Sequence, residues 1–203
     1  MSTFEQLAVM NSDCPDGFAH SQYSTRFSHL HIMKSKYKEW TICKITANDT
    51  KSVLAFIIPM LHEIYPNIPD VAVRWDLANM EEAYTLDPKT ALFAALNQDG
   101  KVVGTIAIRP YDDRFGKVKG CYDMTSTAEL SRCYIDSSLR RQGIAGRLLA
   151  AMEDYCRSVG YSTICLHTHR FLPGGYPFWL SQQFIIRALG NDPLDTVYMD
   201  KSL

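Results

Sequence analysis

The chain has 203 residues, of which 46% are hydrophobic, and a formal net charge of −1. This length suits one domain with a substantial core and room for an appendage. The balanced charge gives no overall basic surface for nucleic acid. The longest apolar run, residues 53–58, is far shorter than the roughly 20 residues of a membrane span. We therefore predict neither a nucleic-acid partner nor a membrane partner.

The cysteines also limit the class of protein. Six are scattered along the chain, and none forms a C-x-x-C pair. In a chain of this length, that spacing argues against a disulfide framework and favours free thiols in a reducing compartment. The first residues lack a basic start followed by an apolar segment, so no secretory signal is expected. We predict a cytoplasmic protein.

The first part of the chain divides into an unpatterned segment and the start of a domain. Residues 1–38 show no sustained period, and we interpret them as an N-terminal extension to a domain at 39–203. Residues 41–46 alternate like a strand, and apolar residues then recur at helical spacing up to Ile64. Pro59 lies inside that helix and predicts a kink or two short helices.

The remaining elements follow in a clear order. The run at 76–84 predicts one short helix, and two apolar runs separated by a Gly-containing turn predict a β-hairpin. A polar segment at 112–127 is expected to be a loop. The later elements are a strand at 128–135, a helix at 144–159 closed by Gly160, a strand at 161–168, a short helix at 178–183 and a strand from 184.

The strand at 128–135, the helix and the strand at 161–168 form a β-α-β crossover, which makes these two strands parallel. The other strands are expected to be antiparallel. The fold class is therefore mixed α/β, with a central sheet flanked by helices.

The turn at 140–146, RRQGIAG, is unusual because basic residues precede a helix whose N-terminus already has a partial positive charge. That arrangement is favourable when an anion binds. Gly143 and Gly146 leave room for a phosphate to approach the free N–H groups of the helix, and Arg140 and Arg141 add charge-assisted bonds. The alternative is a solvated basic surface. The spacing of nucleotide-triphosphate and dinucleotide loops is absent.

The turn resembles the acetyl-CoA pyrophosphate loop of the GNAT N-acetyltransferase superfamily. Arg140, Gly143 and Ala145 fit its pattern Arg/Gln-x-x-Gly-x-Gly/Ala, and the strand before them resembles the family's central strand. The resemblance covers about residues 40–190. It implies two parallel strands that splay apart at a bulge, acetyl-CoA as cosubstrate in the gap, and direct attack by an acceptor amine from the opposite side.

The resemblance also implies which residues bind the cofactor. The pantetheine arm would pair with the backbone of the first strand, which would also supply the oxyanion donor, and the pyrophosphate would lie on the amides of the turn. The residues expected there are Cys133, Tyr134, Ile135, Arg140, Arg141, Gln142, Gly143, Ile144, Ala145 and Gly146.

A base must take a proton from the acceptor ammonium, and two residues compete for that role. His167 lies on the second strand, where some family members have a catalytic Glu. Its ordinary pKa of about 6.5 suits proton transfer near neutral pH. Glu129 lies on the first strand, where other members have a catalytic Glu. Either could instead be a structural side chain that lines the gap.

The segment that supplies the general acid in this family departs from the family's pattern in this chain. Family members commonly use a Tyr in a Phe/Leu-Tyr-x-x-x-Gly-Phe segment, and Trp179 occupies that position. An indole N–H is no acid at neutral pH. Tyr176, one helical turn earlier, could protonate the thiolate, unless it is a packed aromatic and water does so.

Three further expectations concern ligands and partners. Cys165, His167 and His169 alternate on one strand and diverge too little for tetrahedral zinc, so no metal is expected. The acceptor is expected to be a small amine or an amino acid, although a protein lysine or N-terminus stays open, as does a non-catalytic acyl-CoA-binding module. A homodimer is also open, because edge strands in this fold often pair.

Overall fold

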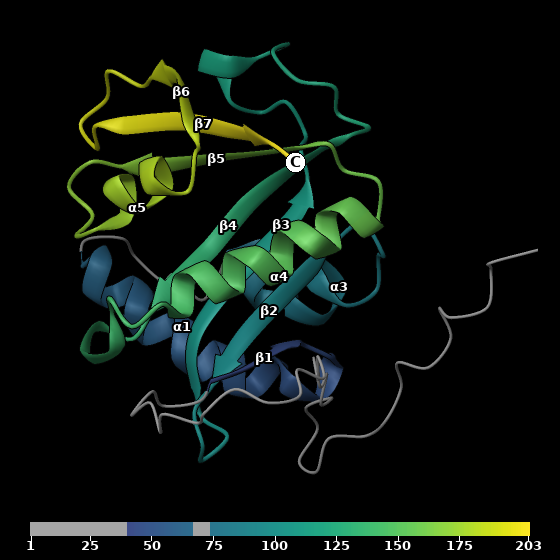
Figure 1. Ribbon diagram of the computed structural model, residues 1–203, viewed down its shortest axis with the longest axis vertical. Coiled ribbons are helices and arrows are strands. Elements are labelled where there is room, and N and C mark those ends of the chain that lie inside the picture. Colours follow the sequence, from purple (N-terminus) through teal and green to yellow (C-terminus); the bar gives the residue numbers. More distant parts are fainter. Residues whose placement is uncertain (1–39, 67–73) are drawn as a thin grey trace, which may run out of the picture.

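The computed structural model describes residues 40–66 and 74–203, which form a mixed sheet covered by helices on both faces (Figure 1). The sheet has seven strands in the order β1-β2-β3-β4-β5-β7-β6. This confirms the predicted mixed α/β class. The extension predicted for residues 1–38 lies outside the described residues.

The strand pairing follows the predicted crossover. β4 and β5 are parallel, and every other neighbouring pair in the sheet is antiparallel. The strands are β1 (Thr41–Lys44), β2 (Ala91–Leu96), β3 (Val102–Pro110), β4 (Thr127–Ile135), β5 (Thr163–His169), β6 (Ile185–Leu189) and β7 (Thr196–Ser202). The α-helices are α1 (Thr50–Ile64), α2 (Trp75–Ala78), α3 (Met80–Tyr84), α4 (Ile144–Ser158) and α5 (Gly175–Ser181).

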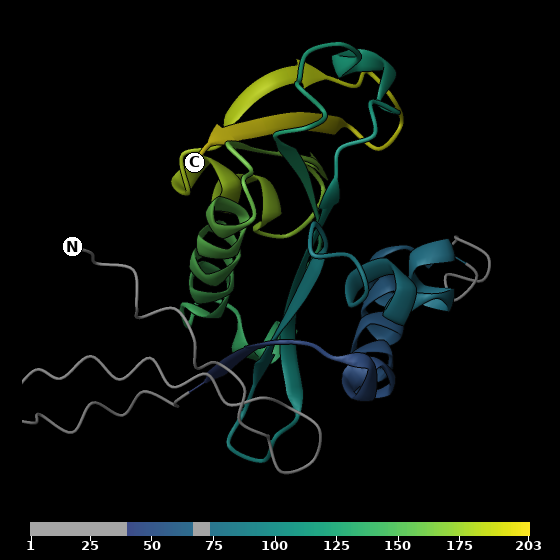
Figure 2. The same cartoon turned by 90° about the vertical axis from the view of Figure 1, so that its right-hand side faces the viewer.

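The two faces of the sheet have separate cores. The edge-on view in Figure 2 shows the helices that cover the two faces on opposite sides of the sheet. On one face, Leu148 and Met152 of α4 pack against β4 and β5 together with Trp179 of α5. On the other face, Ile57 and Leu61 of α1 pack against β2 and β3 together with α2 and α3. Burial of these apolar side chains supplies most of the stabilisation.

Helix α1 is continuous through Pro59, so the alternative of two short helices is wrong. Proline removes one helical hydrogen bond and costs roughly 3 kcal/mol in an ordinary helix interior. Four apolar side chains of α1 are buried, and their burial is worth more than that cost. They are Val53, Ile57, Met60 and Leu61.

The segment at 76–84 is not the single helix that the sequence predicts. It forms α2 and α3, which are separated at Asn79, where φ is −124° and ψ is 46°. The Asn79 side chain donates to the carbonyl of Trp75 at 2.9 Å.

The last strand, β7, was missed in the sequence, where only one strand was expected after residue 184. It lies between β5 and β6 and is buried on both faces. Its sequence therefore does not alternate between apolar and polar residues. Asp200 obscures the strand pattern further, because a charged residue is not expected at a buried position unless it is paired, as Asp200 is with Arg187. Edge strand β6 is exposed along most of its length, including Ile185 and Ile186.

Two expectations about the whole chain can be compared with the described residues. All five cysteines within 40–66 and 74–203 are free. In the same ranges, no helix combines the length and the apolar character needed to cross a bilayer.

Candidate active site

The parallel strands β4 and β5 separate early along their length. Their pairing joins Thr127–Glu129 to Thr163–Cys165, and beyond these residues β4 continues to Ile135 while β5 continues to His169. Figure 1 shows the two strands diverging. This is the splay that the family resemblance implies, and we call the unpaired stretch between the two strands the gap.

A β-bulge lies in β4 where the gap begins. The register with β3 shifts between Thr105 and Ala107, so that Arg132 and Cys133 stand opposite the single residue Ile106. Arg132 has a φ of 53°, in the left-handed region that residues other than glycine rarely adopt. The Thr105 hydroxyl donates to the Arg132 carbonyl at 2.8 Å. The bulge therefore has specific support from β3.

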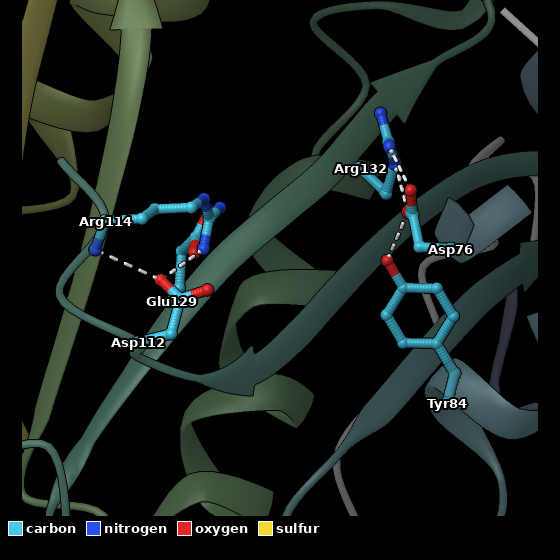
Figure 3. Close-up of polar contacts among 6 residues, drawn as sticks. All are labelled: Asp76, Tyr84, Asp112, Arg114, Glu129 and Arg132. Atoms are coloured by element: carbon cyan, nitrogen blue, oxygen red, sulfur yellow. Dashed lines mark hydrogen bonds and ion pairs between the residues drawn. The ribbon is translucent and has the colours of Figure 1, made fainter. Parts of the chain in front are cut away.

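The side chain of Arg132 is part of a second support, which sequence reasoning missed. Its Nε and Nη2 atoms bond the two carboxylate oxygens of Asp76 at 2.8 and 2.7 Å, and the Tyr84 hydroxyl donates to the same carboxylate at 2.7 Å (Figure 3). Asp76 is buried. The bulge of β4 is thus bonded directly to α2 and α3.

The break at Asn79 is what allows Tyr84 to reach Asp76. In a continuous α-helix, two residues eight positions apart are separated by about 12 Å along the axis. The turn between α2 and α3 shortens this separation and lets the phenol bond the carboxylate.

We expect the stabilising effect of Asp76 to depend on pH. Burial alone would raise the pKa of Asp76, but the bonds and charge of Arg132 outweigh burial and lower it below the ordinary value. A carboxyl with a lowered native pKa stabilises the fold above its unfolded pKa of about 4 and loses that effect as the pH falls through the native pKa. Asp76→Asn should therefore cost about 3–5 kcal/mol of unfolding free energy at pH 7, because it leaves Arg132 unpaired.

Urea unfolding of the wild type and Asp76→Asn between pH 3 and 7 checks this. The difference between the two proteins should be constant down to about pH 4 and then shrink. A difference that is small at pH 7, or that grows as the pH falls, would contradict the assigned ion pair.

The turn before α4 has the geometry expected of an anion-binding turn. Gly143 has a φ of 83° and is the N-cap of α4, and Arg141 also has a positive φ of 62°. A Cβ atom added at Gly143 or Gly146 would meet nothing within 4 Å, so there is open space in front of the backbone for a phosphate. The first helical bond runs from the Arg147 N–H to the Gly143 carbonyl at 3.1 Å. The N–H groups of the preceding residues therefore face outward from the helix start.

The other residues expected to contact acetyl-CoA lie beside this turn. Ile144 is buried and anchors the helix start, whereas Gln142 is exposed and Ala145 is partly exposed. Arg140 is partly buried, and its Nε lies 3.4 Å from the Ile135 carbonyl. The turn thus lies next to the end of β4. Its role in binding stays a prediction.

The end of β4 has its side chains on both faces of the sheet. Cys133 and Ile135 pack on the core beneath α4, and Tyr134 packs on the core beneath α1. Burial raises the pKa of the Cys133 thiol to about 12. The thiol is therefore neutral at pH 7, and the backbone of this strand, rather than the thiol, is what it can offer a ligand.

His167 lies on β5 beyond the last residue that pairs with β4. It is exposed, yet aromatic neighbours surround it: its ring centroid is 4.8 Å from that of Phe115, 5.9 Å from that of His169 and 6.3 Å from that of Tyr198. These neighbours desolvate the ring, and His169 and nearby arginines add positive potential, so the pKa of His167 falls to about 4. The imidazole is therefore neutral at pH 7, as a base must be, but a pKa this low also makes it a weaker proton acceptor than an ordinary histidine.

Glu129, the competing base, is enclosed. Its carboxylate is bonded to the Arg114 guanidinium, which also bonds Asp112 at 2.7 Å (Figure 3). The Glu129 side chain is only 2% exposed. Burial raises its pKa above the ordinary value, although Arg114 acts in the opposite direction. Its second oxygen has no hydrogen-bond partner among the described residues.

Tyr176 lies in the first turn of α5, on the other side of the sheet from the two candidate bases. It packs on the core beneath α4, and the Arg170 guanidinium lies 5.5 Å from the centre of its ring. Trp179 is buried against Phe178 and Phe184. The structure therefore places Trp179 in the core.

The structure brings some of the predicted residues together. Glu129 pairs with Cys165, two residues before His167, so both candidate bases lie on the α1 face of neighbouring strands. Sequence reasoning missed Arg114 and Phe115, which come from the segment interpreted as a loop. A short run of basic and aromatic residues within that polar segment was the only signal.

The sequence predicts no metal at the row formed by Cys165, His167 and His169. His169 is buried, and its Nδ1 lies 3.1 Å from the Thr196 hydroxyl. Among residues 40–66 and 74–203, no three side chains of metal-ligating type gather in one place.

Two solved acetyltransferase structures illustrate this architecture. A GNAT-family acetyltransferase from Staphylococcus aureus Mu50 aligns with a TM-score of 0.67 at 20% identity, over 81% of this chain and 99% of that one. The PaiA N-acetyltransferase from Thermoplasma acidophilum, solved with coenzyme A, aligns with a TM-score of 0.61 at 16% identity, over 81% and 99%. At these identities the likeness shows a shared fold.

Sequence comparison gives relatives of higher identity over shorter segments. Human N-acetyltransferase 8B is 29% identical over 99 residues, which is 49% of this chain and 40% of that protein. Rat N-acetylaspartate synthetase is also 29% identical over 99 residues, or 49% of this chain and 29% of that protein. The matched segment thus spans less than half of either relative.

The family profile gives the broadest match along the chain. The Acetyltransferase (GNAT) family matches residues 55–179, which run from α1 to α5 and include the bulge, the gap and the glycine turn. The chain belongs to the Acetyltransferase (GNAT) family.

Proposed function

We propose that the chain transfers an acetyl group from acetyl-CoA to the primary amine of a small molecule or an amino acid. The observation that supports this most is the left-handed glycine turn at the start of α4, which lies beside the end of β4 where β4 and β5 have separated. The turn offers N–H groups and arginines to a pyrophosphate, and the gap offers a path for the thioester.

In this proposal, the chain binds acetyl-CoA through two elements. Backbone N–H groups from Arg141 to Gly146 and the Arg140 guanidinium contact the pyrophosphate. The backbone of Cys133–Ile135 pairs with the pantetheine arm, and one of its N–H groups stabilises the oxyanion. The open space in front of Gly143 and Gly146 is consistent with this fit.

The acceptor then approaches from the α1 face. His167 takes a proton from its ammonium group, and the neutral amine attacks the carbonyl carbon of the thioester. The attacking nitrogen loses its extra proton to water, the C–S bond breaks to leave the neutral amide, and the thiolate gains a proton from Tyr176 or from water on the α4 face. We prefer His167 over Glu129 as the base because His167 is exposed in the gap, whereas Glu129 is buried behind Arg114.

The names of the relatives bear on the acceptor. N-acetylaspartate synthetase is named for an acetylated amino acid, which supports an amino acid as acceptor here. A protein lysine or N-terminus remains the alternative acceptor, and a non-catalytic acyl-CoA-binding module remains the alternative function. The replacement of the usual Tyr by Trp179 is the feature that favours such a module.

A free-thiol assay tests the proposal. The purified protein is mixed with acetyl-CoA and with pools of amino acids, polyamines, aminoglycosides and lysine peptides, and release of CoA is followed. Amine-dependent release is the expected result, and the active pool identifies the acceptor class. Binding of acetyl-CoA in calorimetry without release from any pool would support the binding module and overturn the transferase.

A further inference from the structure

Two clusters in the molecule have the same chemistry but lie in different places. In each, an arginine binds an aspartate through two hydrogen bonds and a tyrosine hydroxyl donates to the same aspartate. One cluster is Arg132, Asp76 and Tyr84 at the bulge of β4 (Figure 3). The other is Arg187, Asp200 and Tyr122, between β6, β7 and the segment before β4.

We propose that Asp76 and Tyr84 are positioning residues for acetyl transfer, which act through Arg132 to fix the bulge of β4 in its reactive geometry. This inference rests on the proposed function, because it assigns a task to the strand that would pair with the pantetheine arm. It adds two residues from α2 and α3 that do not face the gap themselves.

Arg132 has an unusual backbone conformation that its contacts hold in place. With a φ of 53°, its backbone is in a region that favours glycine, and such a conformation persists where surrounding contacts hold it. The contacts here are the Thr105 hydroxyl on the carbonyl and the Asp76 carboxylate on the guanidinium. The first contact holds the backbone of Arg132, and the second holds its side chain.

Arg132 directly precedes the part of β4 that is assigned to the cofactor. The next residue is Cys133, whose backbone begins the stretch assigned to the pantetheine arm and the oxyanion. A rotation of the Arg132 peptide would therefore reorient those N–H groups. Donors aimed at developing charge must be held in place before the reaction, and small misplacements cost large factors in rate.

The cluster of Arg132, Asp76 and Tyr84 is shielded from water. Only 11% of the Arg132 side chain and 9% of the Asp76 side chain are exposed, so water cannot readily replace either partner. The Tyr84 hydroxyl satisfies the Asp76 oxygen that also bonds Arg132 Nε. Removal of that hydroxyl leaves the ion pair in place but loosens the carboxylate.

The helices α2 and α3, which supply Asp76 and Tyr84, also border open space on the α1 face. A hollow of about 530 Å³ is lined by Trp75 and Ala83, one from each short helix, and by Arg109 of β3. The hollow lies on the side from which the acceptor is expected to approach. The cluster of Arg132, Asp76 and Tyr84 therefore joins the acceptor side of the molecule to the strand that faces the thioester.

The experiment compares matched variants of the two clusters. Tyr84→Phe and Asp76→Asn alter the cluster at the bulge. Tyr122→Phe and Asp200→Asn make the same changes in the cluster at β7. The Asp200 carboxylate is also buried, but the side chain of its arginine is 47% exposed. Calorimetry with CoA, kcat and KM for acetyl-CoA, and urea unfolding are measured on all four variants.

We expect Tyr84→Phe and Asp76→Asn to lower kcat by about tenfold or more, because the reactive strand is misplaced. Hydrogen exchange at the amides of Cys133–Ile135 should become faster in these two variants than in the wild type. Tyr122→Phe and Asp200→Asn should lose stability but keep kcat. If Asp76→Asn does not fold, Tyr84→Phe is the deciding variant, because it retains the ion pair between Arg132 and Asp76.

Two results would overturn the inference. One is a wild-type kcat in Tyr84→Phe, or in a folded Asp76→Asn. The other is an equal loss of kcat in both pairs of variants, since that would reflect stability alone. A wild-type protein that neither binds CoA nor releases it would instead overturn the proposed function, whatever the exchange rates show.

Discussion

Replacement of Gly143 by aspartate is expected to weaken the binding of acetyl-CoA at least about 100-fold, which corresponds to about 2.7 kcal/mol. Two effects act together. A carboxylate would stand in the open space where the pyrophosphate is proposed to lie, and a side chain at a φ of 83° would strain the turn that orients the N–H groups. Calorimetry with CoA measures the change.

Gly160→Asp is the matched control for this variant. Gly160 lies beyond the other end of α4, has a φ of 85°, and likewise has nothing within 4 Å of an added Cβ. The two substitutions therefore impose a similar backbone strain on the same helix. Aspartate is even a favourable residue at a helix N-terminus, so Gly143→Asp should be the less destabilising of the two.

Gly160→Asp should bind CoA about as well as the wild type, because distant sites act independently. Two equal affinities, both near that of the wild type, would show that the turn at 140–146 does not bind the pyrophosphate. Equal losses would point to a general loss of folding, which urea unfolding of both variants would reveal.

Much of the fold could be predicted because its elements are locally consistent. The helix α4 has apolar residues on one face and a stop at Gly160, and the helix in the structure ends at Ser158, next to it. The crossover from β4 through α4 to β5 fixes a parallel pair by chain geometry. Periodicity and handedness were sufficient for these elements.

The parts that were not predicted depend on contacts between distant residues. Asp76 and Tyr84 fall within one helical pattern, and only tertiary bonds to Arg132 explain why the chain breaks at Asn79. The left-handed backbone of Arg132 has no sequence signature, because such conformations are typical of glycine and asparagine. A β-bulge at an arginine becomes visible only when its partners are in place.

The candidate site also has one part that the sequence predicts and another that depends on contacts between distant residues. Glycines and arginines in consecutive positions describe the turn, so a short motif was enough to propose it. The candidate bases are separated in the chain by almost forty positions, and their roles depend on burial. The sequence left His167 and Glu129 open, and the structure separates them by exposure, since Arg114 covers Glu129 from a loop.

His167→Ala is expected to lower kcat/KM about 100-fold or more at pH 7, a typical loss for a positioned general base. The effect should depend on pH in a specific way. Above the pKa of the acceptor amine, the amine is already neutral and needs no base, so the variant should approach the wild-type rate. Because the pKa of His167 lies well below 6.5, the wild-type profile should show no inflection near 6.5.

Two variants complete this test. His62 is an exposed histidine on α1, and His62→Ala should leave the rate unchanged, which controls for the loss of an imidazole. Glu129→Gln keeps the shape of the side chain and one acceptor for Arg114, and it should change kcat/KM far less than His167→Ala does. If Glu129→Gln has the larger effect, and that effect disappears at high pH, then Glu129 is the base. In that case Arg114 must move away from Glu129 before the acceptor can bind, and mobility of the segment around Phe115 would become part of the reaction cycle.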